Sequence, residues 1–182
     1  MNQPTKTMKK LALIILLIPA LALAQDDSEL KAIQILNDYR ASKGLPALII
    51  NKGLCKAAQY QVKYETLVDS VTHFQYVDLP NFEEILKAGD RIRKFAEIEP
   101  PMGGTEITMG SKFRGSPGFY AKEEFNHNLE KYIIDSYKSS KFHNLAIMNP
   151  EAHQVGISIY KEELKEGNQI KFKLFCVITF GS

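Results

Sequence analysis

The chain has 182 residues, 45% of them hydrophobic, and only two cysteines, which is enough to bury one core and too few cysteines for a disulfide scaffold. The first 24 residues hold three of the 23 Lys and Arg residues and none of the 21 Asp and Glu residues, so the remainder has 20 basic against 21 acidic residues. No basic stripe interleaved with aromatic residues is present there, which argues against nucleic-acid binding.

Residues 1–24 are typical of an export signal. Three lysines precede an apolar run over residues 11–23, and Ala22-Leu23-Ala24 is a small-x-small cleavage site. The run has 13 residues, fewer than the ~20 that span a bilayer, and acidic residues follow it at once. An uncleaved membrane anchor is the alternative interpretation. We predict cleavage after Ala24, which leaves residues 25–182 as one secreted or periplasmic domain that is not an integral membrane protein.

Two helices are expected at the start of this domain. Ser28 can cap a helix that ends where Gly44 supplies a left-handed stop before Pro46, and its apolar stripe consists of Leu30, Ile33, Leu36 and Tyr39. A second helix from Lys52 to Leu67 has an inward face made of Leu54, Ala57, Ala58 and Val62. We expect the two helices to pack against each other at the alanines.

The pattern is weak between residues 70 and 116. Short helices are expected around residues 82–88 and 90–97, and Pro100 to Gly104 predicts a turn. Gly110, Gly115 and Gly118 predict a loop.

The C-terminal third contains the clearest patterns. Apolar residues from Phe125 to Tyr137 recur at helical spacing. Val155–Tyr160 and Ile170–Phe180 predict a hairpin around a polar turn at residues 166–168. Every second residue from 170 to 180 is apolar, and Phe175 and Val177 occupy the opposite face. The last half of this strand is therefore expected to be buried on both sides.

Short motifs form an ordered set along the chain. Leu36 to Arg40 matches an L-N-x-x-R helix core, residues 44–48 match G-L-P-x-L, and residues 54–58 match L-x-x-A-A. Residues 137–143 are similar to a W-x-x-S-x-x-H segment, and Asn149-Pro150 with residues 155–157 to an N-P…V-G-V continuation. Thr179-Phe180-Gly181 is the last motif of this set and lies at the end of the chain. From about residue 30 to residue 181 the chain resembles the bacterial branch of the CAP superfamily, the family of cysteine-rich secretory and plant pathogenesis-related proteins.

This resemblance implies an α/β fold, a three-layer α-β-α sandwich with a central, mainly antiparallel sheet. It also implies a cleft lined by histidines and acidic residues, which often holds a divalent cation such as zinc. By position, His73, Glu106 and His143 match the lining residues, and two imidazoles with one carboxylate and a water form an accepted zinc ligand set. These three residues are the predicted metal ligands.

The sequence departs from the family pattern near these positions. It has Thr105, Ile107, Tyr137 and Asn144 where the family has Gly, Asn, Trp and a basic residue. The second acidic ligand of eukaryotic members has no match, and His153 is an additional candidate for the cleft.

The expected function is a secreted binding or interaction module for a protein, small-molecule or lipid partner, rather than an enzyme. No nucleophile motif surrounds Ser140, three residues before His143, so we assign no catalytic residue. Two alternatives are a metal-dependent hydrolase with Glu106 as general base for a metal-bound water, and a protein that binds lipids or sterols. Cys55 and Cys176 form either a disulfide or two separate thiols, and both options stay open at this stage.

Overall fold

The computed structural model describes residues 26–75, 79, 82, 87–96, 104–113, 128–166 and 169–182. The predicted export signal lies outside the described residues, as do Phe125, most of the segment predicted as a helix around residues 82–88 and the first four residues of the predicted turn at 100–104.

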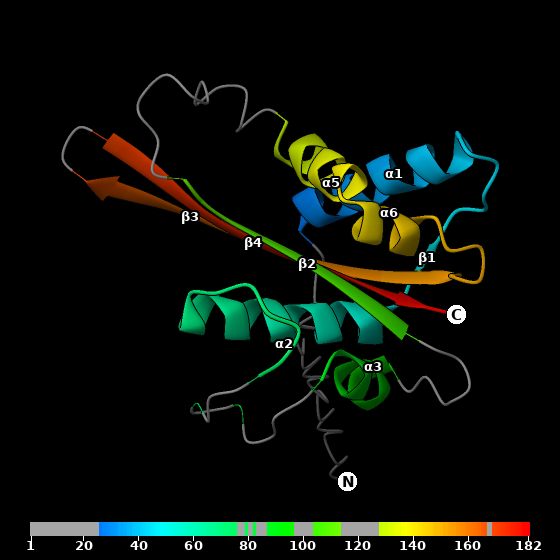
Figure 1. The fold of residues 1–182 in the computed structure, drawn as a ribbon, viewed down its shortest axis with the longest axis horizontal. Coiled ribbons are helices and arrows are strands. Elements are labelled where there is room, and N and C mark those ends of the chain that lie inside the picture. Colours follow the sequence, from blue (N-terminus) through cyan, green and yellow to red (C-terminus); the bar gives the residue numbers. More distant parts are fainter. Residues whose placement is uncertain are drawn as a thin grey trace, which may run out of the picture.

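The described chain forms three layers around a twisted sheet (Figure 1). The sheet order is β1 (Ile49–Ile50), β3 (Gln154–Glu166), β4 (Gln169–Gly181), β2 (Gly104–Phe113). One face is covered by the upper layer, which comprises α1 (Asp27–Ala41), α5 (Leu129–Ser139) and α6 (Lys141–Ile147). The lower layer on the other face comprises α2 (Lys52–Val68) and α3 (Ala88–Ala96). Only the short β1–β3 pairing is parallel, so the predicted three-layer, mainly antiparallel sandwich is confirmed.

Local sequence accounts for the ends of the first two helices. Asp26, not Ser28, is the N-cap residue of α1, and its side chain accepts a hydrogen bond from the backbone N–H of Ser28. Gly44 adopts a left-handed conformation at φ 77° just after α1, as predicted. Asn51 caps α2 by accepting from two backbone N–H groups, and Asp69 ends that helix at φ 54°.

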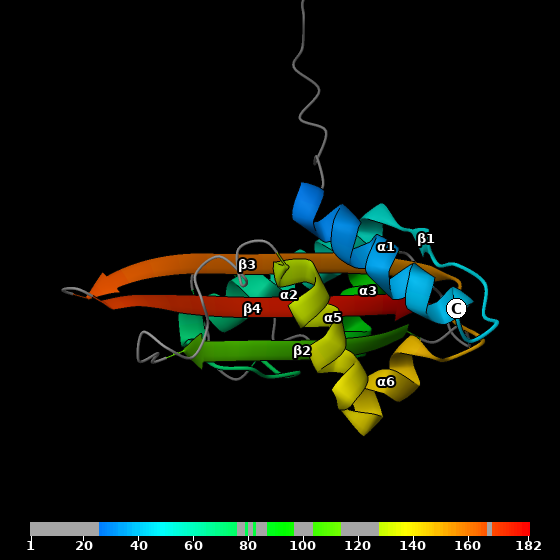
Figure 2. The same ribbon diagram turned by 90° about the horizontal axis from the view of Figure 1, so that it is seen from above.

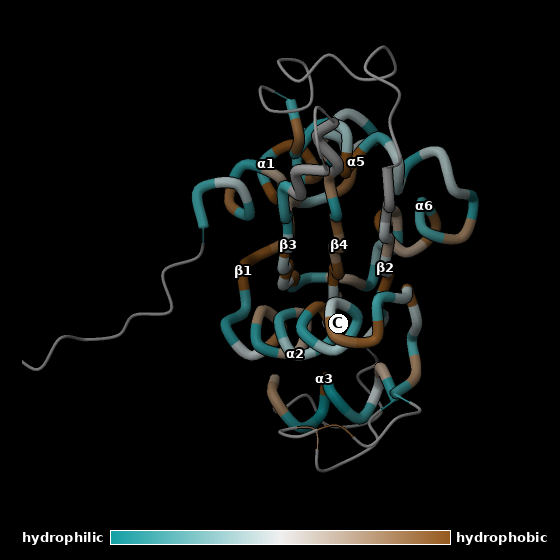
Figure 3. Tube along the Cα trace, turned by 90° about the vertical axis from the view of Figure 1, so that its left-hand side faces the viewer, coloured by the Kyte–Doolittle hydropathy of each residue, from teal (hydrophilic) through white to brown (hydrophobic). Residues whose placement is uncertain are grey.

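The C-terminal hairpin has the predicted two-sided burial. β3 and β4 pair antiparallel over their whole length, and Figure 2 shows them running side by side across the molecule. Leu174, Cys176, Ile178 and Phe180 belong to the core beneath the upper layer. Phe175 and Val177 instead point to the other face of the sheet and pack on α2 of the lower layer. The hydropathy of the chain agrees, since β4 is brown where it passes between the helix layers (Figure 3).

Two expectations about the first half of the domain are wrong. α1 and α2 do not pack against each other, because they lie on opposite faces of the sheet (Figure 1). α2 packs on β3 and α3 instead, and a Cβ at Gly156 of β3 would lie 2.2 Å from backbone atoms of α2. Gly110 is part of strand β2 rather than of a loop, and a Cβ at Gly110 would meet the side chains of Val71 and Phe175. The rest of that predicted loop, with Gly115 and Gly118, lies outside the described residues.

The two cysteines are not joined by a disulfide. Cys176 lies in the core under the upper layer, whereas Cys55 is carried by α2 on the other face of the sheet, so the sheet separates them. No helix within the described ranges combines the length and apolar character needed to cross a membrane.

Candidate functional site

Strand β2 presents two buried polar side chains to the lower layer. Its residues alternate, so Ile107 enters the core beneath α5, while Glu106 and Thr108 face α3 and α2. β2 pairs only with β4 in the described sheet and therefore forms one of its edges. The polar face of this edge strand is thus covered by the two helices of the lower layer.

Glu106 lies under His73 and against Arg91. The His73 ring nitrogen Nδ1 is 3.2 Å from Glu106 Oε1. The Arg91 guanidinium donates from Nη2 to Oε1 at 2.6 Å and from Nε to Oε2 at 3.2 Å, and from Nη2 also to the backbone carbonyl of His73. The Arg91 and Glu106 side chains are fully buried, whereas that of His73 is 43% exposed. The hydrogen bond to Glu106 raises the pKa of His73.

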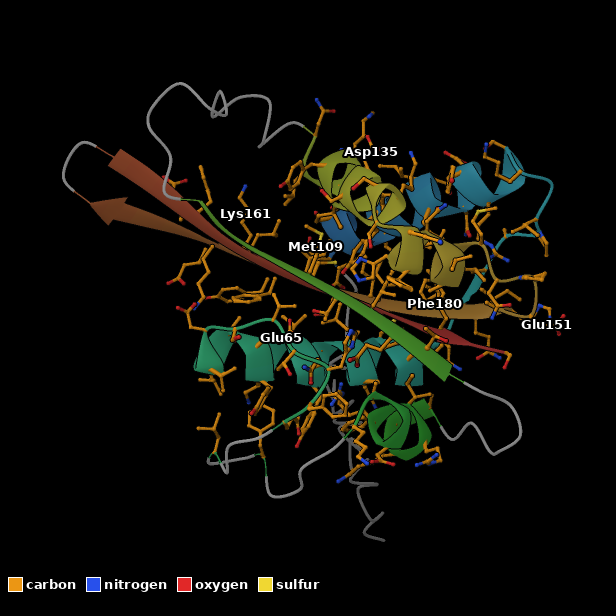
Figure 4. All side chains as sticks on the ribbon, in the orientation of Figure 1. Glu65, Met109, Asp135, Glu151, Lys161 and Phe180 are labelled. Atoms are coloured by element: carbon orange, nitrogen blue, oxygen red, sulfur yellow. The ribbon has the colours of Figure 1, made fainter. Side chains whose placement is uncertain are left out.

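A second buried carboxylate, Glu65, lies behind this group between α2 and the sheet (Figure 4). It accepts hydrogen bonds from the Thr108 hydroxyl at 2.8 Å, from the Thr72 backbone N–H at 3.1 Å and from the Gln61 amide at 3.3 Å. Burial raises the pKa of Glu65 to about 7, against the effect of these hydrogen bonds. The bond from Thr72 also fixes the backbone next to His73.

His143 comes from the other helix layer. It lies on α6, and its ring makes an edge contact with the ring of the buried Tyr137, with centroids 5.3 Å apart. Burial lowers the pKa of His143, and the charge of His73 lowers it further. The structure therefore brings His73 into contact with Glu106, and it places His143 on α6, which packs against β2 at the edge of the sheet.

His153 is not part of this group. Its backbone bonds to Ile49 of β1 and to Gly181 of β4, which puts it on the side of the sheet away from β2.

The sequence model of the cysteine-rich secretory protein family, CAP, matches residues 33–180. The chain belongs to the CAP family. Two solved structures share the fold of this CAP domain. An outer surface protein from Borrelia burgdorferi has a TM-score of 0.56 and 16% identity, with 86% of this chain and 93% of that chain covered.

The other is an extracellular protein containing an SCP domain from Bacillus anthracis, with a TM-score of 0.54, 14% identity, and 81% of this chain but 39% of that chain covered. A search of curated proteins finds no match to the CAP domain described here.

The polar groups of this CAP domain do not fit the predicted zinc site well. A zinc ligand must offer a free lone pair, but three of the about four lone-pair positions of Glu106 already face Arg91 or His73, both of them on Oε1 and one on Oε2. A cation at Glu106 would also lie beside the fixed positive charge of Arg91. Within the described ranges no group of three or more His, Cys, Asp or Glu side chains has an arrangement that could hold a metal ion. Zinc binding by His73, Glu106 and His143 stays a prediction.

Sequence reasoning missed Glu65 and Arg91. A signal for Glu65 was present, because Gln61 and Glu65 continue the inward stripe of α2 at helical spacing, and a polar residue on a buried stripe needs a partner. Arg91 gave no comparable signal. It is one of three basic residues within four positions, and only the docking of α3 distinguishes it from its exposed neighbours Arg93 and Lys94.

Proposed function

We propose that this CAP domain is an exported binding module, whose surface around His73 and His143 takes a ligand and does not hydrolyse it. The carrying observation is that the Glu106 carboxylate is fully buried and that Arg91 holds both of its oxygens. A general base must reach the proton that it abstracts, so this carboxylate is poorly placed to activate a water. The words "outer surface" and "extracellular" in the names of the two similar proteins support a place outside the cytoplasm.

The surroundings of both histidines support a contact surface. Next to His73, Phe74 is 44% exposed, and on α6 the side chains of Phe142 and Leu145 are 78% and 60% exposed. Large apolar side chains left in water near a polar group are typical of binding sites. The proposed ligand therefore has an apolar part for these side chains and a polar atom for the exposed edge of His73.

Dye binding tests the contact surface. The fluorescent probe anilinonaphthalene sulfonate carries an apolar ring system and an anionic group, and it should bind the folded protein. Replacing one anchoring aromatic ring costs more than about 1 kcal/mol, so Phe74→Ala or Phe142→Ala should weaken binding by about tenfold. Leu30→Ala removes an apolar side chain of α1 that is as exposed as that of Phe74, and it is the matched control. Equal affinity in all variants would refute the contact surface.

A hydrolase is the second candidate, because a carboxylate that holds a histidine at Nδ1 also occurs in general-base catalysis. Hydrolysis of fluorogenic peptides and p-nitrophenyl esters, with and without zinc, separates the two functions. We expect the same background rate from the wild type, His73→Ala and His143→Ala. A rate that disappears in either variant would make the protein an enzyme. Lipid found by mass spectrometry in the purified protein would favour the lipid-binding alternative instead.

A further inference from the structure

The charge that balances Glu106 comes from the chain itself. The Arg91 side chain is 0% exposed and makes two bonds to the carboxylate and one to the His73 carbonyl. A buried carboxylate needs a nearby positive charge and hydrogen-bond donors to stay ionised. A planar guanidinium supplies both, with donors at the spacing of the two carboxylate oxygens.

The packing of α3 fixes Arg91 in this place. α3 is docked between the start of α2 and the start of β2, and a glycine lies at each contact. A Cβ at Gly53 would lie 2.2 Å from the backbone oxygen of Phe95, and a Cβ at Gly104 would lie 2.6 Å from the side chain of Ile92. Ile92 is itself buried beside Arg91. These two close contacts of α3 therefore hold the guanidinium beneath β2.

This arrangement competes with metal binding at the same atoms. A carboxylate offers about four lone-pair positions, and Arg91 and His73 direct three N–H or ring-nitrogen contacts at those of Glu106. The position left over is on Oε2, which is buried with the guanidinium bonded to it, so a divalent cation could use it fully only by displacing Arg91. It would also meet the repulsion of the guanidinium if Arg91 stayed.

We propose that Arg91 is the permanent counter-cation of Glu106, in the role that a bound divalent ion would otherwise have. The group of His73, Glu106 and Arg91 then folds without metal and binds a metal ion only after Arg91 is removed. This proposal deepens the proposed function and rests on it only in taking the surface around His73 as the ligand site. The expected consequence is that substitution of Arg91 alone makes the stability of the protein depend on zinc.

Thermal unfolding of the purified protein, with zinc chloride or with a chelator, tests the proposal. Zinc at about 100 times a micromolar Kd would raise the Tm of a protein with a true site by roughly 5–10 °C. We expect no such rise for the wild type and no loss of Tm with the chelator. Arg91→Ala should lower the Tm without metal and regain it with zinc. Arg93→Ala, which removes an exposed arginine of the same helix, should behave as the wild type does.

A further variant keeps the test decisive if Arg91→Ala folds poorly. Arg91→Ala combined with Glu106→Gln removes both charges, and we expect it to fold and to show no zinc response. A zinc-dependent rise in the wild type that His73→Ala or Glu106→Gln abolishes would overturn the proposal. So would an equal zinc response in the double variant. Neither outcome bears on hydrolysis, whereas turnover of peptides or esters would refute the proposed binding function and leave the role of Arg91 intact.

Discussion

Arg40 is fully buried, and its guanidinium donates only to backbone carbonyls among the bonds described for it. The acceptors are the carbonyls of Pro46, Ile147, Asn149 and Ala152, at 2.5 to 3.2 Å. They belong to the loop after α1, the last residue of α6 and the turn that leads into β3. Arg40 therefore ties α1 to the segment that holds α6 and His143 in place.

Arg40→Met keeps the apolar stem and removes all four bonds. Two of them, to Ile147 and Ala152, are wholly buried, so these two carbonyls would lose a charged donor with no water to replace it. A buried polar group left without a partner costs about 1–3 kcal/mol, and the two part-buried carbonyls can be solvated. We therefore expect the free energy of unfolding to fall by about 2–6 kcal/mol.

Urea denaturation followed by circular dichroism measures this loss. The matched control is Arg93→Met, which removes an exposed arginine whose ion pair with Asp90 should contribute under about 1 kcal/mol. A loss below about 1 kcal/mol for Arg40→Met, equal to the control, would refute the argument that these carbonyls depend on the guanidinium.

Three further predictions follow from buried groups. The pKa of Glu65 is about 7 in the folded state against an ordinary value of 4.5, so its contribution to stability is present below pH 4.5 and lost as the pH rises through 7. Urea unfolding at pH 5 and pH 8 should differ by about 2–3 kcal/mol in the wild type, and Glu65→Gln should remove most of this difference. Gly156→Ala should destabilise the fold by at least about 2 kcal/mol, because the added Cβ would meet backbone atoms of α2. Gly89→Ala is the control, since its Cβ would meet nothing within 4 Å, and it should leave the Tm in thermal unfolding unchanged. Thiol titration should find two reactive thiols in denaturant, with Cys176 unreactive in the native protein because burial raises its pKa, and a disulfide to Cys55 would contradict the structure.

The amphipathic helices and the hairpin could be predicted because their patterns are local. The apolar residues of α2 recur at helical spacing, and those of β4 alternate. Each pattern is contained in one continuous segment and indicates which face of that segment is buried. Strand β2 was missed because its glycines resemble loop signals. Gly110 is explained by Val71 and Phe175, which lie far from it in the sequence.

The candidate site also has a part that the sequence predicted and a part that it did not. Motif positions alone led to His73, Glu106 and His143, since a family resemblance fixes which residue stands at each position. The sequence by itself also determined the first two helices, the C-terminal hairpin and the two buried faces of β4. Only the tertiary structure decided that Glu106 is paired with Arg91, 15 residues away, and that Glu65 meets Thr108, 43 residues away. The physical reason is that apolar residues recur at the spacing of a helix or strand, whereas a single charged residue gives no such pattern in the sequence. Its partner depends on how the helices dock on the sheet.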